Sequence, residues 1–526
     1  MSFRRAFVVL TVGLGVVLPV AGPCTADLWN YGSFLNRPGS WRWSSLAANS
    51  LCLVAGTCVL ALPVGTLLAL LLERTDLIGR KWIQRGLIVA LFVPLPVIAT
   101  AWQEVVGGGG WSIGLPAAIC LHAIAGLPWV VWLVALGAAS IEPEVEDDAL
   151  THASAWVVLQ RVVLSRIWAS VGVAGLWLAI SCATEITITD VTQVRTFAEE
   201  VYTQTVLPDP GAPVETMPAR AVAVAFPPVV LTTLFVGFVV VRWRSRLPAL
   251  TSTPRQRPIV LLGRWQAPMF ALALLTLIAL LAVPIGVLVQ RLGMSRHGAW
   301  SASDAAKYLF RAAIAHGPTI GRTVGAAVCV GGIATALAVI SCSIVRRGWW
   351  AGVALVVITA ALWSAPGPVI GVALKQAIDS LLDFEGRFGI NVLSPILYSG
   401  PSPIPAAWAC LIRFFPCAVA LVWPAVRVIP VGQFDSAELD GAGEVRHVVW
   451  PHAVNAALRA GAAVAILTLG EIGASKIVAT PAGEFFAHDV FARMHYGPGN
   501  QLAALCLLML AVVIPPAVLL SISRAR

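Results

Sequence analysis

The stretch FVPLPVIATAWQE at residues 92 to 104 returns later in the chain as WSAPGPVIGVALKQ at residues 363 to 376. Both copies contain P-x-P-V-I, and each lies within a long apolar run. Proline lacks an amide hydrogen and therefore interrupts a helix. Two equivalent interruptions in two apolar runs indicate that one structural unit is used twice in this chain.

Further matches follow in the same order along both parts of the chain. They pair LPAA (115 to 118) with IPAA (404 to 407), VVLSRI (162 to 167) with VVWPHA (448 to 453), and FAEEVY (197 to 202) with FAHDVF (486 to 491). The same number of residues separates Leu164 from Glu185 and Trp450 from Glu471. We predict a first unit at residues 1 to 245, a linker at 246 to 265 and a second unit at 266 to 526.

The composition predicts an all-α polytopic membrane protein. The chain of 526 residues is 58% hydrophobic and only 12% charged, far from the usage of soluble domains. A spanning helix needs roughly 20 mainly apolar residues. About twelve such segments occur, centred near residues 14, 60, 94, 127, 178, 230, 277, 331, 360, 415, 467 and 511. Six helices in each unit would make the two repeats parallel, related by an axis along the membrane normal.

Basic residues gather in alternate short loops, which predicts the orientation of the chain. The formal charge of +9 does not form a basic face, so we expect no nucleic-acid partner and attribute the charge to the positive-inside bias. This bias places both termini in the cytoplasm. Alternatively, Arg4 and Arg5 with the apolar residues 6 to 21 form a cleaved signal peptide.

Several function classes lack their sequence signals. The ten Cys contain no C-x-x-C pair, the eight His form no metal-ligand pattern, and no G-x-x-x-x-G-K-[ST] phosphate loop occurs. We therefore expect no catalytic residues, no metal site and no cofactor, and we expect any ATP hydrolysis to reside on a separate chain.

Each unit has one polar segment, which lies between its fourth and fifth predicted helices. The two segments read EPEVEDDALTHASAWVVLQRVVLS (142 to 165) and PVGQFDSAELDGAGEVRHVVWP (430 to 451). In each, carboxylates precede an Ala/Gly-rich stretch, which predicts a short cytoplasmic helix that begins with acidic residues. A solvated loop helix with no partner is the alternative.

Both segments resemble the E-A-A-x-x-x-G loop of the permease subunits of binding-protein-dependent ABC importers. In that family the loop forms a coupling helix that docks on an ATPase subunit. The resemblance assigns ATPase coupling to Asp435, Ala437 and Gly441 in the second unit and to Asp147, Asp148, Ala149 and His152 in the first. The copies depart from the pattern: His152 replaces Gly, Ser165 replaces Pro, and the second copy is about three residues short before Trp450.

The resemblance extends over almost the whole chain and is strongest to fused two-unit permeases of the ferric-iron type. The segments ATEITITDVTQVRTFAEEVYTQ (183 to 204) and LGEIGASKIVATPAGEFFAHDVFARMHYG (469 to 497) carry it. It implies a bacterial plasma-membrane permease that takes a small solute, best matched by ferric iron, from a periplasmic or lipid-anchored binding protein. Two copies of an ATPase would drive it, and its other contacts are with membrane lipid. Thiamine, sulfate, polyamine or phosphonate permeases, and an ion-coupled secondary transporter, are the alternatives.

Six residues are candidates for the substrate pathway or its gate. Glu185 and Glu471 fall near the outer ends of the fifth and eleventh predicted helices, where a carboxylate usually faces a cavity or a partner. They could contact substrate, touch the binding protein, or pair with Lys375, Arg413 or Lys476. The four prolines of the repeated motif, expected to kink their helices near the gate, are Pro94, Pro96, Pro366 and Pro368.

Overall fold

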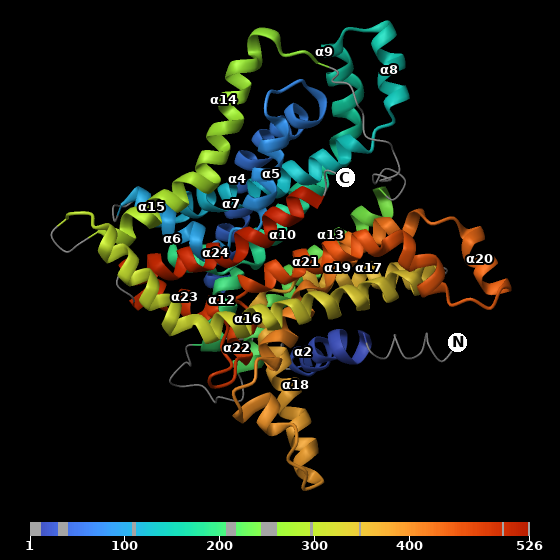
Figure 1. Ribbon diagram of the computed structural model, residues 1–526. Coiled ribbons are helices and arrows are strands. Elements are labelled where there is room, and N and C mark those ends of the chain that lie inside the picture. Colours follow the sequence, from blue (N-terminus) through green and yellow to red (C-terminus); the bar gives the residue numbers. More distant parts are fainter. Residues whose placement is uncertain are drawn as a thin grey trace.

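The computed structural model describes residues 12–29, 40–107, 112–206, 217–243, 260–294, 298–346, 349–496 and 499–523. These ranges form helices joined by turns and loops, with two isolated β-bridges (Figure 1). Residues 246 to 259 of the predicted linker lie outside the described residues, as do residues 1 to 11 of the alternative signal peptide.

The half of the chain up to residue 243 is here called the first half, and the half from residue 260 the second half. The helices of the first half are η1 (Gly13–Val17), α2 (Leu18–Trp29), α4 (Ser40–Arg74), α5 (Arg80–Leu91), α6 (Leu95–Val106), α7 (Leu115–Ala139), α8 (Pro143–His152), α9 (Ala155–Val158), η3 (Leu159–Val163), α10 (Leu164–Thr184), α11 (Thr187–Val191), α12 (Phe197–Val206) and α13 (Met217–Trp243). Those of the second half are η5 (Gly263–Trp265), α14 (Gln266–Leu277), η6 (Ile278–Ala282), α15 (Val283–Gly293), α16 (Ala302–Val345), α17 (Trp349–Ser364), α18 (Gly367–Arg387), η7 (Pro395–Ser399), α19 (Ile404–Val428), α20 (Val431–Leu439), η8 (Val445–Val449), α21 (Trp450–Leu469), α22 (Ser475–Val478), α23 (Phe486–Tyr496) and α24 (Gly499–Ser523).

The chain is an all-α multi-pass membrane protein. Among the described residues, eight helices are long and apolar enough to cross a membrane, or up to ten if each of two bent helix pairs counts as one span. The two remaining predicted segments contain the shorter apolar helices Gly15–Cys24 and Val224–Phe238. Since a full span needs roughly 20 apolar residues, the number of twelve stays a prediction.

Both copies of P-x-P-V-I lie where one helix stops and another begins. The pair α5 and α6 is bent by 102°, and the pair α17 and α18 by 105°. Pro94 and Pro366 are the N-caps of α6 and α18, with ψ angles of 140° and 142°. Pro96 and Pro368 fall in the first turn of these helices. Backbone N–H groups there have no acceptor within the helix, so a proline costs no hydrogen bond. The expected kinks are therefore complete restarts of the helix.

The two halves share a second kind of irregularity. A π-helical turn, η3 or η8, lies near the end of each of the two polar segments and runs directly into α10 or α21. The first helix of each half also contains a π-helical turn, η1 or η6. Such turns are rare and are frequent at functional sites.

The first and last helices of each half pack on the bent pair of the other half. α2 and α13 of the first half contact α18, and α13 also contacts α17. In the mirrored arrangement, α14, α15 and α24 of the second half contact α5 and α6. Two observations fix this crossing: the indole N–H of Trp408 in α19 donates to the carbonyl of Gly15 at 2.6 Å, and Val16 is buried in the core of the second half.

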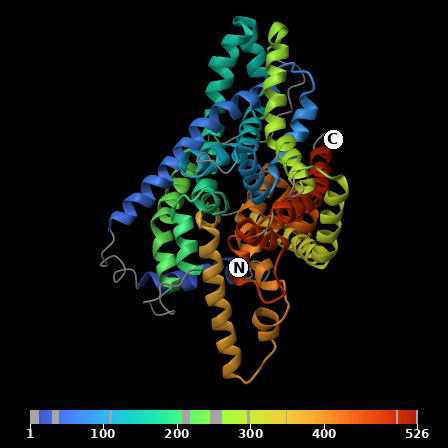
Figure 2. The ribbon, with the colours of Figure 1, turned by 90° about the vertical axis from the view of Figure 1, so that its left-hand side faces the viewer.

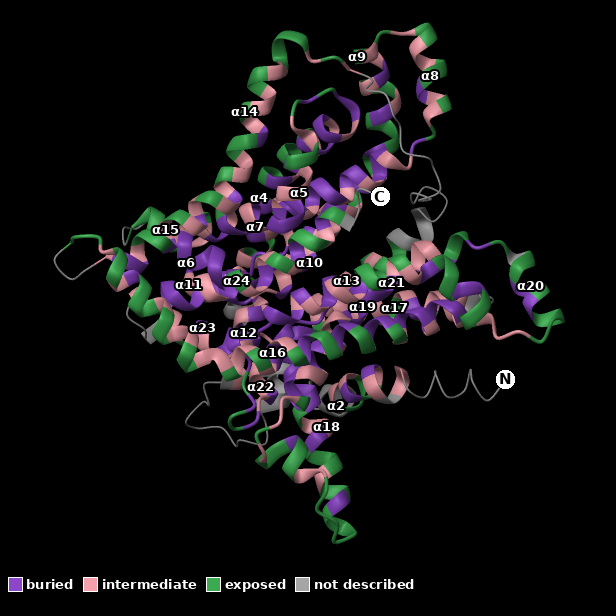
Figure 3. Cartoon of the chain, in the orientation of Figure 1, coloured by how far each residue is buried: buried purple, intermediate pink, exposed green. Residues whose placement is uncertain are grey.

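Helix α18 is longer than the sequence predicted. The apolar run predicted near residue 360 does not end at residue 376: α18 continues unbroken to Arg387 and projects beyond the helical body, at the end opposite to α8 (Figures 1 and 2). The carboxylate of Glu385 holds the following loop, because it accepts N–H groups from Val392, Leu393 and Ser394 at 2.5–3.3 Å. The far end of α18 is largely exposed, as are parts of α8, α14 and α20, whereas buried residues fill the centre (Figure 3).

Candidate functional site

A cavity of about 260 Å³ lies between the two halves, close to both helix breaks. It is lined from the first half by the α5–α6 break, α7 and the end of α10, and from the second half by the α17–α18 break, α19 and the end of α21. Pro94, Glu185, Glu471 and Arg413 all line it. The structure thus brings three of the six predicted pathway residues into one cavity. Pro96, Pro366 and Pro368 are at the breaks but are not among the lining residues.

Glu185 uses its carboxylate to hold the start of α11. Its two oxygens accept the backbone N–H groups of Thr187 at 2.5 Å and Ile188 at 2.9 Å. On its other side, Nε2 of His122 lies 3.6 Å away. The Nδ1 of that ring lies 2.8 Å from the carbonyl of Ala118 and must donate to it, because a carbonyl only accepts.

Glu471 plays the same role in the second half. Its oxygens accept the backbone N–H groups of Ala474 at 2.7 Å and Ser475 at 2.9 Å, at the start of α22. The thiol of Cys410 lies 3.9 Å from the same carboxylate. None of the ion pairs among the described residues joins either glutamate to Lys375, Lys476 or Arg413, so the structure does not support this alternative for the two carboxylates. The carboxylates satisfy backbone groups that a turn in an apolar surrounding would otherwise leave unpaired.

Arg413 projects from α19 into the region between the halves. Its guanidinium donates to the carbonyl of Ala365, at the end of α17, and to Thr184 Oγ1, at the end of α10, the latter at 3.1 Å. It therefore ties a helix break of the second half to the first half. None of the ion pairs within the described ranges includes Arg413.

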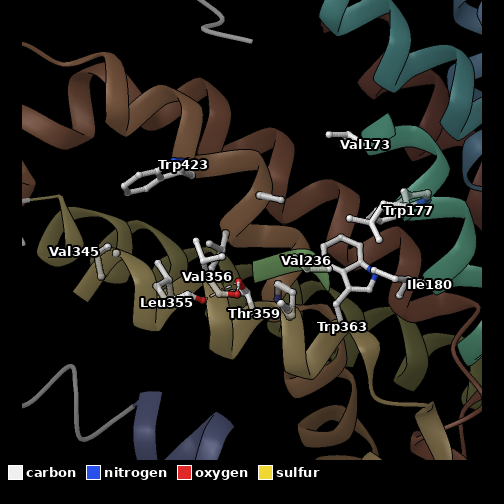
Figure 4. A pocket seen from close by; sticks show the side chains of 16 residues that line it. Val173, Trp177, Ile180, Val236, Val345, Leu355, Val356, Thr359, Trp363 and Trp423 are labelled. Carbon is white, nitrogen blue, oxygen red and sulfur yellow. Dashed lines mark hydrogen bonds between the residues drawn. The ribbon is translucent and has the colours of Figure 1, made fainter. Parts of the chain in front are cut away.

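Three tryptophans form a wall along the cavity. The ring centroids of Trp129 and Trp177 are 4.7 Å apart, and those of Trp177 and Trp363 are 4.2 Å apart. Beyond this wall lies an apolar pocket of about 270 Å³ between α10, α13, α17 and α19 (Figure 4). Trp177 and Trp363 line both spaces, and the apolar pocket reaches Val345, at the end of α16. The rings therefore separate a polar cavity from an apolar one.

A buried ion pair anchors α8 in the first half. Arg74, the last residue of α4, contacts Glu146 of α8 with Nε and Oε1 2.9 Å apart, and both side chains are almost completely buried. The same guanidinium donates to the carbonyl of Ala138 near the end of α7. Of the predicted coupling residues, Asp147, Asp148, Ala149 and His152 all lie in α8. The carboxylates of Glu144 and Glu146 occupy its first turn, as predicted.

An arginine at the matching place holds α20 in a different way. Arg346 directly follows α16; its guanidinium lies 4.6 Å from the ring centroid of Phe434 and donates to the carbonyl of Ile429. Asp435 and Ala437 lie in α20, and the prediction that the carboxylates begin this helix was wrong. Pro430 caps the helix, so it starts four residues before Asp435.

Gly441 ends the turn after α20. Its φ angle is +66°, a left-handed conformation that favours glycine. Its N–H donates to the carbonyl of Glu438, and the N–H of Ala442 donates to that of Ala437 at 2.8 Å, which is the hydrogen-bond pattern of a Schellman ending. The first half has no such ending: Ala153 leaves α8 in an extended conformation, with φ −145° and ψ 156°.

The matched segments FAEEVY and FAHDVF form α12 and the start of α23, on the side of the cavity away from α8. Tyr202 of the first meets Phe491 of the second, with ring centroids 6.3 Å apart in a T-shaped arrangement. His488 Nε2 lies 2.7 Å from Ser475 Oγ, whose hydroxyl donates to the carbonyl of Glu471 at 3.1 Å. Burial and the neighbouring Lys476 lower the pKa of His488 to about 3. At the matching position, burial raises the pKa of Glu199.

Comparisons with models of protein families, with curated proteins and with solved structures all gave no match. The sequence did signal Arg413, since a charge inside an apolar run marks a functional candidate. It gave no such signal for His122, Trp129, Trp177 or Trp363, because their shared cavity depends on contacts between distant helices.

Proposed function

We propose that this chain is the membrane-spanning subunit of a bacterial ABC importer that receives its solute from a separate binding protein. The observation that carries the proposal is the pair α8 and α20. Each follows a long span, stands out from the helical body on the right of Figure 1, and is held by an arginine at the end of α4 or α16. A helix that is exposed on one side and anchored on the other is suited to receive force from a partner and pass it to the spans.

The internal duplication supports the same proposal. The breaks at Pro94 and Pro366, the π-helical turns η3 and η8, and the capping glutamates occur at matching positions of both halves. We infer twelve spans in two parallel six-helix repeats, with both termini in the cytoplasm. The central cavity then lies on the axis that relates the repeats, where a solute pathway between two moving halves is expected.

In the proposed mechanism, two ATPase copies close on ATP and push α8 and α20. The push moves α10 and α21 through η3 and η8, and it changes the two helix breaks that border the cavity. A binding protein docked near α12 and α23 would then release its solute toward the cavity. The Trp177–Trp363 contact is suited to act as the inner gate, since it separates the cavity from the apolar pocket. Ferric iron is the best-matched solute by resemblance, and thiamine, sulfate, polyamine and phosphonate remain the alternatives.

The test is reconstitution in liposomes with the ATPase and binding protein encoded beside this chain. We expect ATP hydrolysis stimulated by the binding protein, and loss of most of the stimulation in Gly441→Arg and Asp435→Lys. Arg427→Gln, an exposed site at the end of α19, is the matched control and should retain it. Solute flux driven by an ion gradient without the ATPase would instead support a secondary transporter.

A further inference from the structure

The charged groups of the central cavity differ in how much hydrogen-bonding capacity they have left. Each of the two carboxylates accepts two backbone N–H groups and faces a third group, His122 beside Glu185 and Cys410 beside Glu471. A carboxylate offers about four lone-pair directions. Backbone N–H groups of the protein itself therefore take about half of the acceptor directions of each carboxylate.

The donors of the cavity are in the opposite condition. A guanidinium has five N–H groups, and Arg413 uses one to Ala365 and one to Thr184. Three remain without a partner among the described residues. The Thr184 hydroxyl accepts from Arg413 and keeps its own hydrogen. Arg413 lines the cavity together with Trp177, Trp363 and Phe414, whose rings exclude water and strengthen an ionic hydrogen bond.

We propose that the cavity takes a solute through an oxyanion, a carboxylate or an inorganic oxyacid group, which Arg413 binds by paired hydrogen bonds. This inference rests on the proposed function only in identifying the bound anion as the transported species. The planar fork of a guanidinium matches a carboxylate or phosphate in two parallel bonds. The volume of about 260 Å³ is near the lower end of small-ligand cavities.

The proposal narrows the solute chemistry. A bare metal cation or a polyamine would need several acceptor oxygens, and about half of the acceptor directions of the two carboxylates are taken by backbone N–H groups. Iron, if it is the cargo, would then enter with an anionic chelator attached. The alternatives that carry an oxyacid group, such as sulfate and phosphonate, fit the same donors.

The experiment measures equilibrium binding to the purified full chain in nanodiscs, without ATPase or binding protein. The probes are citrate, ferric citrate, sulfate and inorganic phosphate as anions, and spermidine as the cation. We expect wild type to bind at least one anion and to prefer it over spermidine. Arg413→Gln should weaken that binding at least about tenfold, and Arg413→Lys should weaken it less, because it keeps the charge and loses the fork.

Arg427→Gln removes the same charge from an exposed place on the same helix and should leave anion binding unchanged. Binding of ferric citrate and citrate alone would identify a carboxylate ligand, and binding of sulfate or phosphate an inorganic one. No anion binding to wild type, equal binding by Arg413→Gln, or preference for spermidine would each overturn the inference. Anion binding without ATPase coupling would overturn the proposed function and leave the site in place.

Discussion

Helices α8 and α20 occupy matching positions in the two halves, but they are held by different interactions. An arginine at the end of α4 or α16 contacts each of them, through a buried carboxylate in α8 and through an aromatic ring in α20. The two helices also end differently, since only α20 is closed by a left-handed glycine. The two halves thus keep an arginine anchor at a matching place but differ in the chemistry of the contact.

Among the variants that test this difference between α8 and α20, we expect the largest loss of stability from a substitution of Arg74. Arg74→Gln removes the guanidinium that faces the buried carboxylate of Glu146, and breaking a buried ion pair from one side costs about 3–5 kcal/mol. Arg346→Gln removes a cation–π contact worth about 0.5–2 kcal/mol. Hydrogen exchange of the full chain should therefore rise much more in residues 143–152 for the first variant than in residues 431–439 for the second.

Two controls separate the charge from the packing. Arg161→Gln alters an exposed arginine near α8 and should leave exchange unchanged. The double variant Arg74→Met with Glu146→Met replaces the ion pair by apolar groups and should recover most of the protection. Equal effects of the two arginine variants would contradict the asymmetry of the anchors.

The next effect concerns how α20 ends. Gly441→Ala places a side chain in a left-handed conformation at a cost of about 1–2 kcal/mol, although a Cβ there would meet open space. Gly432→Ala, within α20 and also in open space, should stabilise the helix by about 0.5–1 kcal/mol. Protection of residues 431–439 from hydrogen exchange should thus fall in the first variant and rise in the second. If both glycine variants reduced the protection of residues 431–439, the left-handed ending at Gly441 would not be what stabilises α20.

The smallest effect is a pH dependence of opposite sign in α12 and α23. Because the folded pKa of His488 is about 3, below the ordinary value, its stabilising contribution is complete above about pH 6.5. That contribution is lost as pH falls toward 3, by at most about 1.4 kcal/mol per pH unit. Glu199 has a raised pKa, so its contribution is complete at low pH and is lost as pH rises through the raised value.

Thermal unfolding of the purified chain between pH 5 and 8 measures both slopes. His488→Gln should flatten the rise of stability with pH. Glu199→Gln should increase stability at the upper end of the range relative to wild type. If both variants changed the pH dependence of stability in the same direction, the opposite pKa shifts of His488 and Glu199 would be contradicted.

Local patterns in the sequence predicted much of this fold. The apolar runs, the prolines at two breaks, the short helices in the two polar segments and the place of Glu185 and Glu471 at helix ends all follow from composition and spacing. The start of α20 was missed because Asp435 looked like a helix beginning, whereas Pro430 fixes it earlier. The sequence did not reveal the partners of the glutamates, because a charge within an apolar run indicates an ion pair as readily as a bond to backbone N–H groups.

The contacts that define the candidate site depend on residues far apart in the chain. Arg74 and Glu146 are separated by 72 residues, and Arg413 and Thr184 by 229. Among 20 tryptophans, no local signal distinguishes the three that form the cavity wall. These features require the packing of the helices to be known.

The crossing of the first and last helices between the halves bears on how the molecule can be divided. Helices α2 and α13 pack on the α17–α18 pair, and α14, α15 and α24 pack on the α5–α6 pair. Each half therefore buries part of its apolar surface against the other half. Two polypeptides produced by cutting the chain within residues 244 to 259 should therefore assemble when made together, whereas each alone would expose an apolar groove. Any rigid bodies within this protein are therefore mixed, each built from helices of both halves.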